Sequence, residues 1–252
     1  MMNTLKATIV LVIGTLVIAA CDDGGSVAAV DRLECDSVAA FDSYHIDSRT
    51  ALTVSETGAQ ATPNPNDLAP FSVSWDVEAD FTDGGESAQG NLITNDSGSE
   101  GHSQFIHIGD SSWVAFGGGD YIARETLVGP IPFPPSDTCN ALAPDLELAS
   151  MGGTPEDVNG IKSVRYEISD LPATALADMP SLGSSGDAVT VVDKYDGTIW
   201  VASDGYISKL ELAGDGEYEG GRRAMNVELA YEYSDINDVD AEIVAPQPRA
   251  GQ

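Results

Sequence analysis

Two stretches of the chain alternate between apolar and polar residues with a period of two. From Phe71 to Phe81 the odd positions are apolar and the even positions are polar, and from Met225 to Tyr233 the odd positions are again apolar. Successive side chains of a strand point to opposite faces, so each stretch predicts a long antiparallel strand with one buried and one solvated face.

Shorter segments predict further strands. Asp-Gly at 196–197 and at 204–205, each between β-rich runs, indicates two hairpin turns. Prolines and asparagines make 57–70 a loop. The pattern therefore gives roughly nine strands, joined mostly by hairpins. Besides the two long strands, the extended segments are 44–55, 86–94, 104–108, 113–116, 163–168, 188–195, 198–203 and 206–212.

Three alanine-containing segments predict short helices, at 28–42, 137–148 and 172–179, and the first of them is alternatively two turns interrupted near residues 35–37. Asp170 is placed to cap the last of these helices, and Pro180 ends it. The fold class is therefore α+β: an antiparallel sheet with one apolar face that a few helices cover. Alanine covers less area than leucine or phenylalanine, so we expect part of the concave face to stay open.

The N-terminus has the form of a bacterial export signal. Lys6 is followed by an apolar run over 7–20, which is shorter than the ~20 residues of a membrane-spanning helix. Ile18-Ala19-Ala20-Cys21 resembles the lipobox of bacterial lipoproteins, in which the cysteine receives diacylglycerol and becomes the new N-terminus. The alternative is an ordinary signal peptide followed by an incidental cysteine.

The resulting organisation is a leader at 1–20, a flexible tether at 21–27, a single domain at 28–246 and a frayed polar tail at 247–252. We expect an exported protein, attached through Cys21 to a membrane face of the bacterial cell envelope. In such a compartment disulfides persist, so Cys35 and Cys139 are expected to join, the alternative being two buried free thiols. A metal site from these two cysteines is the poorer interpretation.

The charge balance excludes some partners. The chain carries 41 Asp and Glu residues against 11 Lys and Arg residues, a formal net charge of −30. Nucleic-acid binding needs a basic stripe for phosphate contacts, and electrostatic docking on anionic lipid needs a basic patch. Acidic surfaces also aid solubility in saline habitats, so the charge alone names no partner.

Several further segments are similar to strands and hairpins of one known group of proteins. Val158-Asn159-Gly160 before the strand at 163–167 is similar to one strand of that group, and Gly197–Ile207, with Trp200, is similar to one of its hairpins. Ile106–Trp113 is similar to a central hairpin, and Tyr233–Pro246 is similar to the closing strand. Together these matches run from about residue 70 to residue 246, and in them the chain resembles the bacterial lipoproteins of the LppX/LprG type.

The resemblance implies a half-open antiparallel β-barrel wrapped around helices, as in the LolA and LolB lipoprotein carriers, with lipid held on the concave face. The chain departs from the group in its very acidic surface and in lacking a recognisable head-group motif. The side chains expected to line the ligand cavity are Phe71, Val73, Trp75, Val77, Phe81, Met225, Val227, Leu229 and Tyr231.

Two interpretations of this apolar face stay open. In one, it lines a cavity for a lipid or another amphiphile. In the other, it packs a closed core, and the chain is a non-enzymatic acidic surface module that binds another envelope protein.

No segment carries a catalytic signature. His102 and His107 have opposite parity on one predicted strand, so they face opposite sides and do not chelate one metal, and His45 is remote in sequence. The glycines at 117–119 are not followed by the Lys-Ser/Thr of a phosphate-binding loop. We therefore expect no enzymatic activity, no cofactor and no metal.

Overall fold

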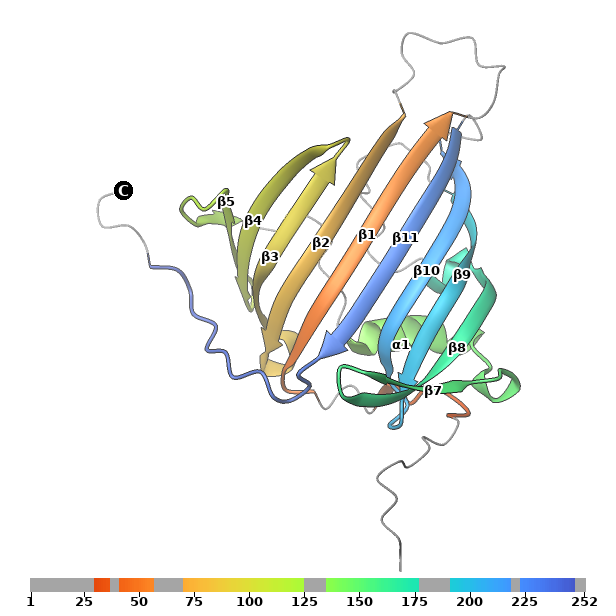
Figure 1. Cartoon of the computed structure of the whole chain (residues 1–252). Coiled ribbons are helices and arrows are strands. Elements are labelled where there is room, and N and C mark those ends of the chain that lie inside the picture. The colour runs from red at the N-terminus through yellow and green to blue at the C-terminus, as the bar shows by residue number, and fades with distance from the viewer. Residues whose placement is uncertain are drawn as a thin grey trace, which may run out of the picture.

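One open antiparallel sheet dominates the molecule (Figure 1). Its eleven strands follow the order β6-β5-β4-β3-β2-β1-β11-β10-β9-β8-β7, and the two outer strands do not pair, so the sheet is not closed into a barrel. The computed structural model describes residues 30–36, 41–56, 70–124, 135–176, 191–218 and 223–247.

The described helical elements are few and short. A single α-helix, α1, spans Pro135–Leu142, and 3-10 turns lie at Asp83–Gly85, Ala143–Asp145, Leu148–Ser150 and Ala173–Leu176. The strands are β1 Tyr44–Glu56, β2 Phe71–Thr82, β3 Ser87–Asp96, β4 Ser99–Ile108, β5 Ser111–Phe116, β6 Ile122–Arg124, β7 Thr154–Val158, β8 Ile161–Pro172, β9 Val191–Ala202, β10 Ile207–Tyr218 and β11 Arg223–Ser234.

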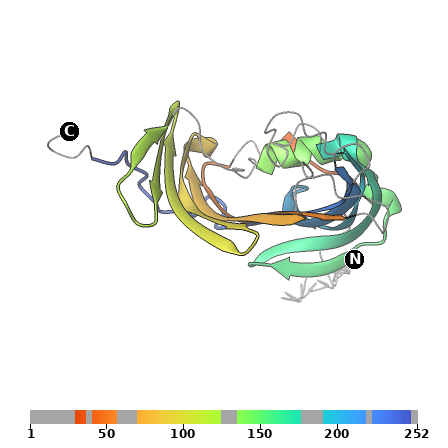
Figure 2. The same ribbon diagram turned by 90° about the horizontal axis from the view of Figure 1, so that it is seen from above.

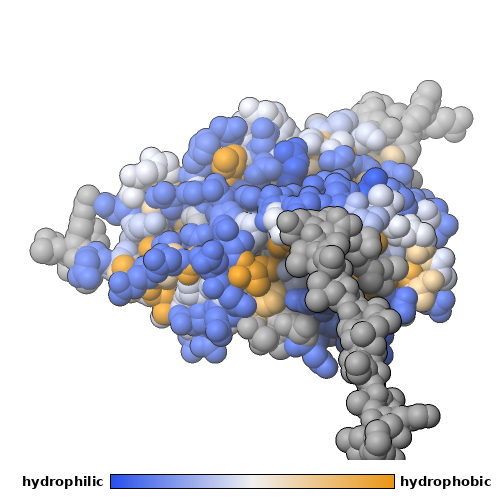
Figure 3. Space-filling model, turned by 60° about the horizontal axis from the view of Figure 1, so that its bottom comes forward, coloured by the Kyte–Doolittle hydropathy of each residue, from blue (hydrophilic) through white to orange (hydrophobic). Residues whose placement is uncertain are grey.

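The sheet curves around α1, so that it has a concave face toward the helix and an outer face away from it (Figure 2). The two long alternating stretches are β2 and β11, which confirms both predictions. Their apolar side chains point to the concave face and their polar side chains to the outer face. The surface seen from the lower end of the sheet is mostly hydrophilic (Figure 3), in keeping with the net charge.

The prediction of a turn at Asp196-Gly197 is wrong. β9 runs through this dipeptide without a break, and Gly197 lies opposite Leu212 of β10. A Cβ at Gly197 would lie 2.0 Å from the carbonyl oxygen of Glu211, so glycine is needed here for close approach of two strands. The Asp204-Gly205 hairpin is confirmed, with Gly205 at φ +86° between β9 and β10.

The helix predicted at 172–179 is also wrong over the described residues. Leu171 and Pro172 continue β8 and pair with β9 after a bulge, and Asp170 takes a positive φ of 59° there instead of capping a helix. Strand pairing satisfies the backbone groups that a helix would otherwise satisfy. Only a 3-10 turn, Ala173–Leu176, follows.

Of the other two predicted helices, one is present in shortened form. α1 ends at Leu142, and Pro144, which has no N–H to donate, is the second residue of the 3-10 turn that follows. In the segment 28–42, the described residues 30–36 and 41–42 form no α-helix. Its backbone is satisfied by other elements: the amide of Glu34 donates to the carbonyl of Gly205, and Asp31 accepts from Ala149.

Candidate functional site

The nine residues predicted to line a cavity lie on one continuous surface. β1 runs between β2 and β11, and its Leu52 is opposite Val73 on one side and Val227 on the other. The same register aligns Trp75 with Leu229 across Thr50, and Val77 with Tyr231 across Ser48. Strand pairing therefore brings together side chains that lie about 150 positions apart in sequence.

Burial along this surface is uneven. Five of the predicted residues are almost fully buried, with 2–6 % of their surface exposed: Val77, Phe81, Met225, Val227 and Tyr231. The remaining four are only partly buried, although they pack against the core: Phe71, Val73, Trp75 and Leu229. The less covered region therefore follows the first half of β2 and reaches across β1 to Leu229.

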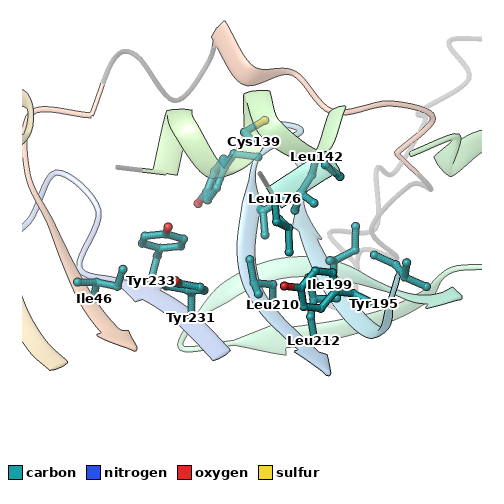
Figure 4. Packing of buried hydrophobic residues seen from close by; sticks show 14 of the residues in the cluster. Ile46, Cys139, Leu142, Leu176, Tyr195, Ile199, Leu210, Leu212, Tyr231 and Tyr233 are labelled. Atoms are coloured by element: carbon teal, nitrogen blue, oxygen red, sulfur yellow. The ribbon is translucent and has the colours of Figure 1, made fainter. Parts of the chain in front are cut away.

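α1 covers the other end of the concave face, beside β10 and the Ala173–Leu176 turn. Cys139 and Leu142 of this helix are fully buried above Leu210, Ile199 and Tyr233 (Figure 4). This end of the face is consequently a packed core and not an open cavity.

Buried tyrosines mark the boundary between sheet and helix. The hydroxyl groups of Tyr233 and Thr138 of α1 lie 3.3 Å apart, and burial raises the pKa of Tyr233 far above its usual value. The Tyr44 ring stacks on Phe81 with centroids 4.8 Å apart. The Tyr44 hydroxyl is buried with no hydrogen-bond partner in the part of the chain that the structure describes, and its pKa is raised by burial and by Asp137.

A disulfide joins Cys35 to Cys139, as predicted, with the two Cα atoms 5.4 Å apart. It ties the N-terminal segment to α1. The same segment is held at Val30, whose carbonyl accepts a hydrogen bond of 2.9 Å from the Tyr166 hydroxyl. The N-terminal segment is thus fixed at two points, Val30 and Cys35.

Arg223 is a buried cation that the sequence interpretation missed. It is the first residue of β11, has 7 % of its surface exposed, and has the parity of Met225, which places it on the concave face. Its Nη1 is buried, and no described residue is its hydrogen-bond partner. The available signal was that an arginine extends the apolar row of β11 by one step.

The outer face carries a polar groove of about 370 Å³ over β3, β2, β1, β11 and β10. Among the described residues, the groove holds three ion pairs. Arg49 pairs with Asp76 at 3.2 Å, and Lys209 pairs with Glu232 at 3.2 Å and with Glu211 at 2.9 Å. Burial lowers the pKa of Lys209, but hydrogen bonds to Glu211 and Glu232 outweigh burial and raise it. The carboxylates lining the groove are Asp47, Asp76, Glu78, Glu211 and Glu232.

Trp200 also lies on the outer face, where other side chains enclose it. The Lys209 Nζ is 4.9 Å and the Arg165 guanidinium carbon 5.8 Å from the ring centre, and the indole N–H donates to Glu156 at 3.0 Å. With 6 % of its surface exposed, Trp200 stabilises the packing of the β7–β8 hairpin on the sheet.

The three histidines lie apart. The Nδ1 of His45 is 2.7 Å from Asp80, and although burial lowers its pKa, that contact and the charges of Asp47 and Asp80 raise it overall. His102 lies opposite Ile93 and His107 opposite Ala88, on opposite faces of the sheet, as predicted. Among the described residues no group of three His, Cys, Asp or Glu side chains is placed to hold a metal ion.

Several predicted features lie outside the described residues: the leader at 1–20, the tether at 21–27 with Cys21, the loop at 57–70 except Pro70, and the tail at 247–252 except Gln247. Within the part of the chain that the structure describes, no helix has the length and apolar character required to span a membrane. No protein-family model matches the chain, and no match to a curated protein was found.

Proposed function

We propose that the chain is an exported, membrane-anchored lipoprotein that binds a lipid or another amphiphile on the concave face of its sheet. On this proposal the open sheet is the half-open barrel of the LppX/LprG type, and Cys21 carries the anchor. The tether at 21–27 then lets the domain move relative to the membrane.

The observation that carries the proposal is the uneven burial of the concave face. Phe71, Val73, Trp75 and Leu229 are only partly buried, while their neighbours in the same rows are sealed. In a closed core, large apolar side chains on the inner surface are fully buried, whereas Phe71 and Trp75 are only partly buried. An acyl chain laid along them gains ~0.8 kcal/mol for each buried CH₂ group.

Lipid extraction tests the proposal. The full chain, expressed with its own leader, is released from membranes with a mild non-ionic detergent, and bound lipid is extracted and weighed by mass spectrometry. We expect about one bound amphiphile per chain. Trp75→Glu places a charge on the concave face and is expected to abolish binding. Ser74→Glu adds the same carboxylate on the outer face and is the matched control for charge.

The proposal fails if the wild-type chain contains no amphiphile and takes none up from vesicles. It also fails if Ser74→Glu and Trp75→Glu lower the bound lipid equally while both remain folded, because that result places the lipid away from the concave face.

The groove on the outer face favours a second candidate function, an acidic module that binds a basic segment of another envelope protein. The groove is lined by five carboxylates against two cations, Arg49 and Lys209. Titration with a lysine-rich peptide tests it: Asp47→Asn with Glu78→Gln should weaken salt-dependent binding more than the exposed pair Asp110→Asn with Asp193→Asn. Equal effects of the two pairs indicate net charge alone.

A further inference from the structure

Among the described residues, one charged side chain lies buried on the concave face with no opposite charge paired to it. Arg223 is the charged residue among the buried polar residues of the described chain, and no ion pair to it is found there. Its Nη1 is sealed from solvent and has no hydrogen-bond partner. Within the described residues, the Tyr44 hydroxyl is the other buried side-chain group without one.

A guanidinium carries a full positive charge under all ordinary conditions, so burying one removes a whole charge from water. An unpaired buried charge is strongly unfavourable, and an anion that reaches it regains the lost solvation. The planar guanidinium fits carboxylate or phosphate oxygens, which accept two parallel hydrogen bonds from it. The unused Nη1 donor therefore suits an anionic group with at least two oxygens.

The position of Arg223 relates it to the proposed lipid surface. Arg223 has the parity of Met225 and Val227. It is the first residue of β11, and β11 begins at the end of the sheet remote from α1 (Figure 1). From Arg223 to Leu229 along β11 is about 20 Å at 3.3 Å per residue. Over this span the rows cross β1 to the partly buried Phe71, Val73 and Trp75. A cation thus stands at one end of an elongated apolar surface, which is almost fully buried on β11 at Met225 and Val227 and only partly buried along the first half of β2 and at Leu229.

We propose that Arg223 binds the anionic head group of the amphiphile, whose acyl chain lies along the partly buried part of β2 and across to Leu229. This inference rests on the proposed function and names its ligand class: a single-chain or multi-chain amphiphile with a carboxylate or phosphate head. The protein then binds this amphiphile more tightly than a neutral amphiphile of the same length, because a hydroxyl head group does not balance the charge of the guanidinium.

Photolabelling tests this selectivity. Membranes that contain the full chain are given a diazirine-bearing palmitic acid or the matching fatty alcohol, irradiated, and the modified residues are identified by mass spectrometry. We expect the acid to label the concave face of the wild type ten- to a hundredfold more than the alcohol. Arg223→Gln should remove that preference, Arg223→Lys should keep most of it, and Arg32→Gln, which alters an exposed arginine paired with Glu34, should leave it unchanged.

The register also places Glu56 opposite Arg223, which gives an internal alternative for the counter-charge. If Glu56 were that partner, Arg223→Met would lower the melting temperature, Glu56→Gln with Arg223→Met would restore it, and the acid would not be preferred. That set of results overturns the inference. On our account Arg223→Met raises the melting temperature of the unloaded chain.

The remaining outcomes are distinct. Equal labelling of the concave face by acid and alcohol, unchanged in Arg223→Gln, removes Arg223 from head-group binding and leaves the proposed function standing. No labelling of the concave face by either probe removes both. In the last outcome, inorganic phosphate alone stabilises the wild type but not Arg223→Gln, and the fatty acid labels neither. This result means that Arg223 binds a free anion, and it refutes the amphiphile as the ligand.

Discussion

The disulfide between Cys35 and Cys139 should carry a large share of the stability of the domain. It closes a loop with a sequence separation of 104 residues. The chain-entropy model for a loop of this length gives about 4.7 kcal/mol at 25 °C. For a domain of this size that corresponds to a melting temperature lower by roughly 9–19 °C after reduction.

Urea unfolding of oxidised and reduced protein, followed by tryptophan fluorescence, measures the effect. Reduction breaks the S–S bond but removes no side chain, so no mutational cavity contributes to the difference in stability. The variant with Cys35→Ala and Cys139→Ala, with and without reductant, reports what the reductant does by itself. Identical urea midpoints for oxidised and reduced wild type, or two titratable thiols in the oxidised native protein beyond Cys21, refute the reasoning.

Three further predictions follow from single features. Intact-mass measurement of membrane-extracted protein should give a chain that begins at a diacylglyceryl-modified Cys21, and an unmodified cysteine contradicts the lipobox interpretation. The pKa of His45 is raised in the folded protein, so protonated His45 stabilises the fold fully below the unfolded pKa of about 6.5, and this contribution is lost as pH rises through the folded pKa. In Asp80→Asn, an NMR titration should show a lower His45 pKa, and the melting temperature should lose that pH dependence. Gly197→Ala should destabilise the sheet by about 1–3 kcal/mol, because its Cβ would meet a backbone oxygen at 2.0 Å; Gly101→Ala, with its nearest contact at 3.9 Å, is the control and should change the urea midpoint little.

The period of the hydrophobic pattern was a reliable guide wherever one face of the sheet is wet. β2 and β11 have polar side chains on the outer face, so alternation marked both their type and the face of each residue. Local turn chemistry was less reliable. Asp196-Gly197 has the composition of a hairpin turn, but the tertiary requirement for close approach to Glu211 decided its structure.

The helices were over-predicted for a related reason. Leu171 and Pro172 have neighbours that favour a helix, yet pairing with β9 satisfied their backbone. For the candidate site, the apolar row could be predicted residue by residue. The partial burial of Trp75 and the burial of Arg223 could not be predicted from the sequence. Both depend on which segments cover the concave face, and contacts between residues distant in sequence decide that.

The most direct test of amphiphile binding compares two adjacent positions that face opposite sides of the sheet. Leu229 lies on the concave face, and Ala230 lines the outer groove. The photoreactive p-benzoylphenylalanine is introduced at one position or the other in the full chain, and cross-linking is carried out in intact cells. We predict a lipid cross-link at position 229 and none at 230. A protein cross-link at 230, with no lipid at 229, would contradict lipid binding and favour the acidic interaction module.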